Sequence, residues 1–464
     1  MNVQSPALID SVTSMQSDVL VMTVGAGEEG KRVETLYNSM RSSMSSGSWV
    51  RIVLLPSSIT EEFAKELILH VARDSAARFN LEVGETLAAG DEEYEDRCFA
   101  HFDRELARLI ESGVRASDMV VDYTRGTKAM SAAAVLAALG RGVDRIRYIS
   151  GKRDPQKHTI IPGTERALDG RTTEAAFQRG LSDAKLLLRE GQFVAAAELL
   201  KKIERELPAG HAGRREAQSG QEVARFWAAW DRFHYENAVA LAKPVSAAGL
   251  FWREGAPSQG QLNWLAELAK EPPRPKKLSS VEDHRLLARS MANVHRRASV
   301  DLLQNAWRRW HLGNWDDALI RAFRSVELIG QAALCKQGIL ATAVCEADSR
   351  IQKWLKSPEM QSAKWSLRRP GYGNLPPQIA QPVIPKLLEF LGETKFAKCL
   401  EKLDRVKNRH QSLLVHGMCS QVPDGKDLAG LLSAIEDLIG EEDGGNAVFS
   451  RLSVFPFPAI SNSR

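Results

Sequence analysis

The chain has 464 residues, 44% of them hydrophobic and 26% charged, and this composition excludes a disordered or fibrous protein. Its 62 Lys and Arg residues and 58 Asp and Glu residues leave a formal charge of +4, which is too small for a protein that coats nucleic acid. Any nucleic-acid site must therefore be local. At roughly 150 residues per domain, the length predicts several domains.

The cysteines and the apolar stretches bear on cofactors and location. The five cysteines include no CxxC pair and show no zinc-ligand spacing, so we expect reduced thiols and no metal site. The N-terminus lacks a basic segment followed by an apolar run, and no apolar stretch reaches the roughly 18 residues that a membrane helix needs. We expect a cytoplasmic protein that makes no contact with a membrane.

Residues 1–165 alternate short apolar runs with amphipathic stretches such as Glu61–Arg78 and Glu92–Glu111. The apolar runs are Val19–Val24, Val50–Leu55, Phe79–Val83, Met119–Tyr123 and Arg145–Ile149. Continuous Val, Ile and Leu runs separated by helices predict a parallel sheet that is covered on both faces. The first domain is therefore expected to be a Rossmann-like α/β domain.

The remainder of the chain has an all-α pattern. Three segments share a turn signature of a glycine or charged residue, an aromatic residue and then alanine: Gly191–Ala195, Phe233–Ala238 and Gly313–Ala318. We predict a helical hairpin at each, because their irregular spacing excludes a regular array of tetratricopeptide-type repeats.

Prolines mark two interruptions of the helical pattern. Glu271–Lys277 combines prolines with solvated charges and is the expected linker, whereas Arg368–Pro385 is expected to be a long loop. We therefore divide the helical part into a connecting domain over 166–295 and a final domain over 296–464.

A glycine-rich loop follows the first predicted strand and begins with Gly25-Ala-Gly27. It fits both GxGxxG and GxxxxGK, but Arg32 stands where a P-loop needs a Ser or Thr to ligate magnesium. The second strand ends in Pro-Ser-Ser, without the acidic residue that would bind a ribose hydroxyl. An NTPase or oxidoreductase is therefore disfavoured. A tight turn and a ligand site at this strand end both remain open.

The fourth predicted strand runs into Asp122-Tyr-Thr-Arg-Gly-Thr-Lys-Ala-Met-Ser131 and then an alanine-rich helix. Gly126 permits a tight turn, and Thr127 can cap the helix. Hydroxyl groups, the cations of Arg125 and Lys128 and a helix dipole converge here, which favours an anion site. The alternative is a capped helix whose charges are merely solvated.

This strand–DxTxGTKxMS–helix segment and the glycine loop resemble the CARF domain of CRISPR-associated proteins. CARF domains form dimers whose paired strand ends bind cyclic oligoadenylate, a messenger made by type III CRISPR complexes. The resemblance implies that the messenger contacts Gly25, Ala26, Thr124, Arg125, Gly126, Thr127 and Lys128. Such a ligand is a polyanion, so the cations fit it electrostatically. Some CARF domains also degrade their ligand, and nothing in the sequence decides this.

Near the C-terminus, Arg405, Arg409, Ser412 and His416 fall within a stripe about 60° wide on a predicted helix. Arginine can neutralise the charge that builds on a scissile phosphate, and histidine can transfer protons near neutral pH. These are the components of a metal-free ribonuclease. The alternative is a solvated helix face with a histidine near its C-terminus.

The Arg409-His410-x-Ser412-x-x-x-His416 segment resembles the motif of HEPN domains, and Asn305–Leu328 resembles the first HEPN helix of CRISPR CARF–HEPN ribonucleases. The resemblance implies that Arg409 and His416 are catalytic, with Asn408, His410 and Ser412 in support. We place His410 toward the apolar side of the helix, where it hydrogen-bonds within the fold.

The two resemblances together imply a homodimeric, metal-independent endoribonuclease that cuts single-stranded RNA in type III CRISPR antiviral defence. It needs no cofactor, and cyclic oligoadenylate is its allosteric activator. The main alternative is a messenger-binding protein whose HEPN domain is inactive and serves only for dimerisation.

Overall fold

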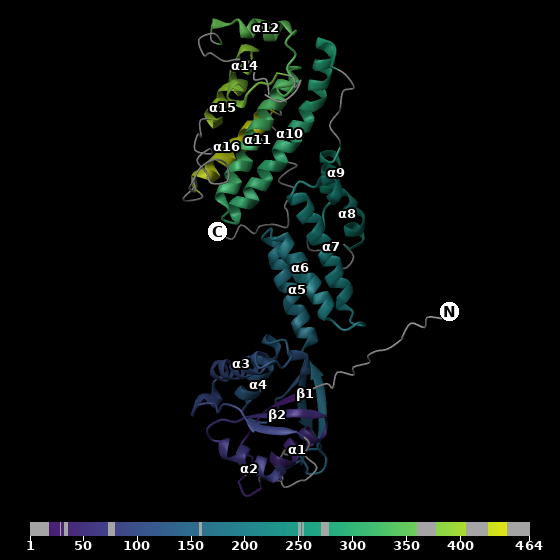
Figure 1. Cartoon of the computed structure of the whole chain (residues 1–464), viewed down its shortest axis with the longest axis vertical. Helices are drawn as coiled ribbons and strands as arrows, with labels where there is room; N and C mark the ends of the chain where they lie inside the picture. The colour runs from purple at the N-terminus through teal and green to yellow at the C-terminus, as the bar shows by residue number, and fades with distance from the viewer. Residues whose placement is uncertain are drawn as a thin grey trace, which may run out of the picture. The chain divides into compact units, whose positions relative to one another are not determined.

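The structure is a computed structural model of the whole chain, and it describes residues 18–27, 29–31, 36–72, 79–156, 160–248, 252, 255–270, 278–358, 360, 377–404 and 426–442. The chain forms two compact units, Met1–Gly180 and Leu181–Arg464, of which the first contains the sheet and the second is helical (Figure 1). In the described residues, no helix is both long and apolar enough to cross a membrane.

The first unit contains a six-stranded sheet in the order β3-β2-β1-β4-β5-β6. The strands are β1 (Asp18–Thr23), β2 (Trp49–Leu55), β3 (Asn80–Val83), β4 (Met119–Asp122), β5 (Arg145–Ser150) and β6 (Arg166–Arg171). The first five are parallel, which confirms the Rossmann-like prediction, but β6 pairs antiparallel with β5. The sequence analysis missed β6 because Arg-Ala-Leu-Asp-Gly-Arg contains no apolar run and lies at an edge of the sheet.

Helices cover both faces of this sheet, as the apolar runs predicted (Figure 1). Val19 and Val21 of β1 point to the face that carries α3 (Glu95–Glu111) and α4 (Lys128–Gly140). Leu20 and Met22 point to the other face, against α1 (Asn38–Ser45) and α2 (Glu61–Ala72). Successive side chains of one strand thus point into two separate cores, and the ends of the strands are left to carry polar loops.

The second unit is built from helical hairpins, and the three predicted hairpin turns are all present. Their helices are α5 (Thr173–Arg189), α6 (Phe193–Glu206), α7 (Gly213–Asp231), α8 (Tyr235–Ala248), α10 (Val281–His311) and α11 (Trp315–Lys336). Gly191, Phe233 and Gly313 adopt φ angles of 73°, 61° and 73°, the left-handed conformation that ends a helix. In each turn this residue donates its N–H to the carbonyl three residues earlier, at 2.8–3.1 Å.

The remaining helices complete the second unit. They are α9 (Gln259–Leu268), α12 (Ser349–Leu355), α14 (Ile384–Phe390), α15 (Thr394–Asp404) and α16 (Lys426–Glu442). The predicted loop Arg368–Pro385 is wrong at its end, because a 3-10 turn over Gln381–Val383 leads directly into α14. Proline is tolerated in the first turn of α14, where its missing N–H costs nothing. The predicted linker Glu271–Lys277 lies outside the described residues.

Candidate functional site

The loops after β1 and β4 touch each other through two glycines. A Cβ atom built on Gly25 would lie 2.8 Å from the backbone nitrogen of Gly126, so only glycine fits at position 25. Gly126 has a φ of 105°, which confirms the predicted tight turn. The Thr23 hydroxyl donates a hydrogen bond to the Arg125 carbonyl and fastens the two loops together. The two sequence motifs therefore form one site at the carboxyl edge of the sheet.

Thr127 caps the helix that begins at this edge. Its hydroxyl oxygen accepts the N–H of Met130 at 3.1 Å, which confirms the predicted cap of α4, and its hydroxyl donates to the Glu92 carbonyl. Lys128 is the first residue of α4 and is exposed, as are Ala26 and Gly126, whereas Gly25 is half-buried. An exposed cation at a helix N-terminus beside bare glycine backbone is suited to a phosphate group.

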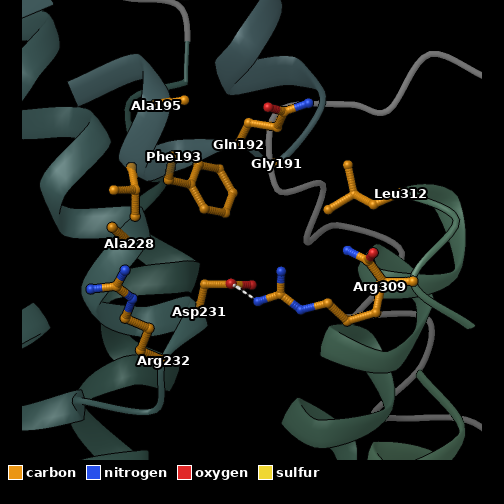
Figure 2. Close-up of a pocket in the computed structure, with 11 residues that line it drawn as sticks. Gly191, Gln192, Phe193, Ala195, Ala228, Asp231, Arg232, Arg309 and Leu312 are labelled. Carbon is orange, nitrogen blue, oxygen red and sulfur yellow. Dashed lines mark hydrogen bonds and ion pairs between the residues drawn. The ribbon is translucent and has the colours of Figure 1, made fainter. Parts of the chain in front are cut away.

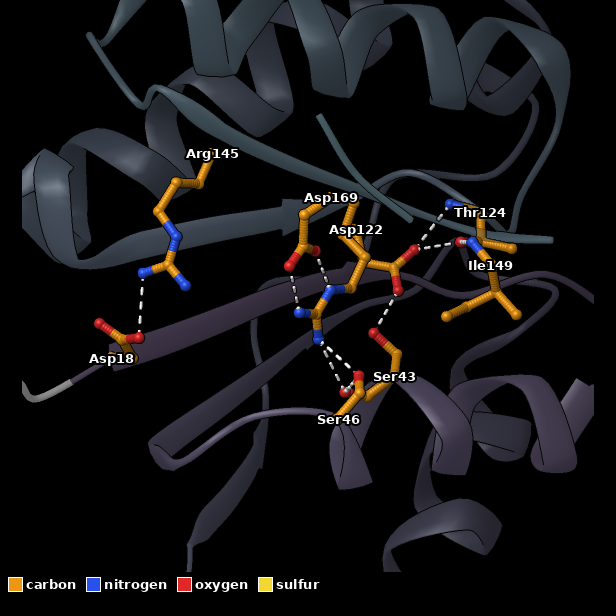
Figure 3. A network of polar contacts seen from close by, with 9 residues as sticks. Asp18, Ser43, Ser46, Asp122, Thr124, Arg145, Ile149 and Asp169 are labelled. Carbon is orange, nitrogen blue, oxygen red and sulfur yellow. Dashed lines mark hydrogen bonds and ion pairs between the residues drawn. The ribbon is translucent and has the colours of Figure 1, made fainter. Parts of the chain in front are cut away.

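Thr124 has a structural role below the surface of this site (Figure 3). Its N–H donates to Asp122 Oδ1 at 2.9 Å, its hydroxyl donates to the same oxygen, and its Oγ1 accepts the N–H of Ile149 at 2.8 Å. Ser43 donates to Asp122 Oδ2 at 2.5 Å. Burial raises the pKa of Asp122, while the Ser43 and Thr124 hydrogen bonds oppose this by stabilising the carboxylate. The Asp122 carboxyl thus fixes the turn through Thr124.

Arg125 and Arg147 are both directed into the fold. Arg125 Nε donates to Ser39 Oγ of α1 at 2.9 Å, and burial lowers the pKa of Arg125. Arg147 is buried, and it donates to Asp169 of β6 at 2.6 Å and to Ser46 Oγ at 2.8 Å. Lys128 is therefore the better-placed cation for a ligand. The sequence analysis did not single out Arg147, although a charged residue in the middle of an apolar strand was a visible signal.

The five predicted catalytic residues, Asn408, Arg409, His410, Ser412 and His416, lie outside the described residues. The structure does describe the helices on either side of them, since α15 ends at Asp404 and α16 begins at Lys426. Both helices pack in one apolar core with α10 and α11. A Cβ atom on Gly330 of α11 would lie 3.0 Å from Leu400 Cδ2, so α15 approaches α11 closely at this point.

A buried polar network joins α7 to α10. Asp231 accepts from Arg308 Nε at 2.9 Å and from Asn305 Nδ2 at 3.0 Å, and it also pairs with Arg309. Nearby, Asp301 accepts from Trp230 Nε1 at 3.0 Å and from the Tyr235 hydroxyl at 2.8 Å, and burial raises the pKa of Asp301.

A pocket of about 470 Å³ opens beside the Asp231–Arg309 pair (Figure 2). It lies where the α5–α6 turn, the end of α7 and the α10–α11 turn meet, and Arg232 and Asn314 also line it. Because Asp231 already neutralises Arg309, we assign this pocket no ligand.

Comparison with known proteins gives one match to a protein family and one match to a solved structure. Residues 288–440 match the family described as the Csm6 HEPN domain. The helical C-terminal part of the chain is therefore similar to a HEPN domain. The fold is similar to the solved structure of Enterococcus italicus Csm6 bound to cyclic hexa-2'-fluoro-hexa-dAMP, with a TM-score of 0.53 and 12% identity over 95% of this chain and 98% of that chain. None of the curated proteins compared with the chain matches it.

The HEPN match covers most of α10 and α16 and all of α11 and α15, and the sequence range of the Arg–His motif lies inside it. The resemblance inferred from the two motifs is thus confirmed at the level of family and fold class. The match begins at residue 288, within α10, whereas the sequence analysis began its last domain at residue 296.

Proposed function

We propose that this CARF–HEPN protein is a metal-independent endoribonuclease of type III CRISPR antiviral defence that cyclic oligoadenylate activates. It cuts single-stranded RNA, works in the cytoplasm and acts as a homodimer. The observation that carries the proposal is the family match over 288–440, because that range contains both Arg409 and His416. HEPN domains are generally ribonucleases, and this chain retains both residues on which their chemistry depends.

The chemistry of the proposed nuclease requires only side chains. The 2′-hydroxyl of RNA attacks the adjacent phosphorus while the bond to the 5′-oxygen breaks, which leaves a 2′,3′-cyclic phosphate. His416 transfers a proton in this step, and Arg409 neutralises the charge that builds on the phosphate oxygens. Two subunits would each contribute one Arg409–His416 pair to a shared cleft.

The proposed sensor is the carboxyl edge of the N-terminal sheet. Gly25 and Gly126 bring bare backbone to the surface, and Lys128 and the N-terminus of α4 offer positive charge to the phosphates of the messenger. The Enterococcus italicus protein, which has the same fold, was solved with a cyclic oligoadenylate analogue. Activation requires that the messenger bind the active arrangement more tightly than the resting one.

A fluorescent single-stranded RNA, incubated with the full chain and a panel of cyclic oligoadenylates, tests sensor and nuclease together. We expect cleavage only with a messenger of the right ring size, and the same rate in the presence of EDTA. Arg409→Ala and His416→Ala should bind messenger normally and lose cleavage. Messenger binding without cleavage by the wild type would instead support the alternative of a sensor with an inactive HEPN domain. Full cleavage by either variant would refute the assignment of these residues.

A further inference from the structure

We propose that Arg147 and Asp169 are positioning residues that couple the messenger site to the helix leading into the helical unit. The inference rests on the proposed function and names a route for its activation. Arg147 lies on β5, beside the strand β4 that ends in the messenger turn, Tyr123–Thr127. Asp169 lies on β6, which is followed after one residue, Thr172, by α5, and α5 continues into the second unit.

A continuous series of hydrogen bonds connects the messenger turn to Arg147. Thr124 of the turn donates its N–H and its hydroxyl to Asp122 Oδ1, and the hydroxyl of Ser43 donates to Asp122 Oδ2 at 2.5 Å (Figure 3). The carbonyl of Ser43 then accepts from Arg147 Nη1 at 3.0 Å. The same nitrogen donates to Ser46 Oγ at 2.8 Å. The end of α1 therefore bridges the messenger turn and the Arg147 guanidinium.

The rest of the guanidinium holds the edge strand β6. Arg147 Nε donates to Asp169 Oδ1 at 2.6 Å, and Nη2 donates to Oδ2 at 3.0 Å. Such two-pronged pairs are among the strongest and most directional that arginine forms. The side chain of Arg147 is 2% exposed and that of Asp169 is 57% exposed, so the pair reaches from the interior to the surface. No residue of β6 is fully buried, and this pair therefore supplements the backbone bonds to β5 in fastening the strand.

The charges of this network make it responsive to an anion. Two carboxyl groups, those of Asp122 and Asp169, draw on the single cation of Arg147. Burial raises the pKa of Asp122, and the charge of Arg147 is among the effects that oppose this rise. A phosphate bound at the messenger turn brings further negative charge to Asp122, which then needs the cation more, so that Arg147 holds Asp169 less firmly. Coupling requires two discrete arrangements, and here they differ in which carboxyl group Arg147 serves.

Asp169→Asn tests this coupling, because it weakens the pair at an exposed position. The full-length variant should resemble the messenger-bound protein. Without messenger, it should cleave fluorescent single-stranded RNA about tenfold faster than the wild type, whereas cleavage at saturating cyclic tetra- or hexaadenylate should be unchanged. Asp169→Glu keeps the carboxylate and should behave as the wild type. Arg171→Gln is the matched control, since it breaks another ion pair of β6, the exposed 2.7 Å pair with Asp144, and should also leave cleavage unchanged.

A gain of unstimulated cleavage separates coupling from a structural role, because damage to the fold can only lower activity. The ratio of saturated to unstimulated cleavage also does not depend on the fraction of folded protein. An unchanged ratio in Asp169→Asn, or a fall that comes only from a slower saturated rate, would overturn the coupling.

Hydrogen exchange follows the same coupling without the nuclease. Saturating messenger should speed amide exchange in Arg166–Arg171 of the wild type, and in Asp169→Asn this exchange should be fast before messenger is added. Equal protection of β6 with and without messenger would overturn the coupling even if the wild type is activated. A wild type that bound messenger but did not cleave RNA would refute the nuclease, and exchange would still decide the coupling. If the wild type bound no messenger, the proposed sensing would fail, and the coupling with it.

Discussion

The contact between Gly25 and Gly126, in the proposed messenger site, makes a quantitative prediction for Gly25→Ala. The added Cβ would lie 2.8 Å from the Gly126 nitrogen, whereas ordinary contact begins at 3.4 Å. The loops must therefore separate by more than half an ångström, against the hydrogen bond from Thr23 to the Arg125 carbonyl. Overpacking of this kind costs about 1–3 kcal/mol of unfolding free energy.

We expect a larger consequence for binding than for folding, because the displaced backbone is the surface that we propose meets the phosphates of the messenger. Denaturant unfolding and titration with fluorescent messenger would measure the two effects separately. Gly140→Ala is the matched control, since it lies at the exposed end of α4 and its added Cβ would meet no atom within 4 Å. If Gly25→Ala had the same unfolding free energy and the same affinity for messenger as Gly140→Ala, the two loops would not be in contact and the site geometry would be wrong.

Three further predictions concern the helical unit. Asp231→Ala should lower the free energy of unfolding by about 3–5 kcal/mol, because it leaves Arg308 and Arg309 without their buried carboxylate. The control Glu236→Ala, which changes an exposed residue of α8, should lower it by less than about 0.5 kcal/mol. Denaturant unfolding measures both. Burial lowers the pKa of His295 to about 4, so the unfolded chain takes up a proton there before the folded protein does. The free energy of unfolding should therefore fall by about 1 kcal/mol as the pH is lowered from 7.5 to 5.5. In a pH series of melting curves, His295→Gln should remove this loss. The hydrogen bond from Arg350 lowers the pKa of Asp348 to about 2, so its stabilising effect is present above pH 4 and should vanish as the pH falls toward 2; Asp348→Asn should flatten acid unfolding over that interval.

Local sequence signals were enough to predict much of this fold. The strands follow from runs of Val, Ile and Leu, and the cap of α4 from a threonine that precedes the helix at a strand end. The hairpin at Phe233 was predicted from its likeness to two glycine turns, although phenylalanine at a φ of 61° is unfavourable and the surrounding helices must hold it there. Each of these features is decided within about six residues of the chain.

The directions in which side chains point, and the contacts between residues far apart in the sequence, were not predictable in the same way. Arg125 was expected to face the ligand because it is a cation close to the N-terminus of the predicted helix. Its partner Ser39 is 86 positions away, and only the packing of α1 reveals it. Asp231 likewise meets Arg308 across 77 positions. The sequence analysis named Glu92 only as the first residue of the amphipathic stretch Glu92–Glu111. Its closeness to Thr127 depends on how β3 and β4 are ordered in the sheet, which no local pattern encodes.

The helix α10 connects the hairpins of the helical unit to the part of the HEPN domain that flanks the Arg–His motif. Two consecutive residues make the connection: Trp307 donates to Glu436 of α16 at 2.7 Å, and Arg308 donates to Asp231 of α7 at 2.9 Å. A helix in a closely packed protein interior moves as a unit, because such an interior deforms little. If α7 shifted while α10 stayed in place, the buried Asp231–Arg308 pair would break, at a cost of several kcal/mol. Movement of α10 with α7 is therefore the cheaper response, and it reaches α16, the helix that follows the motif, through Trp307.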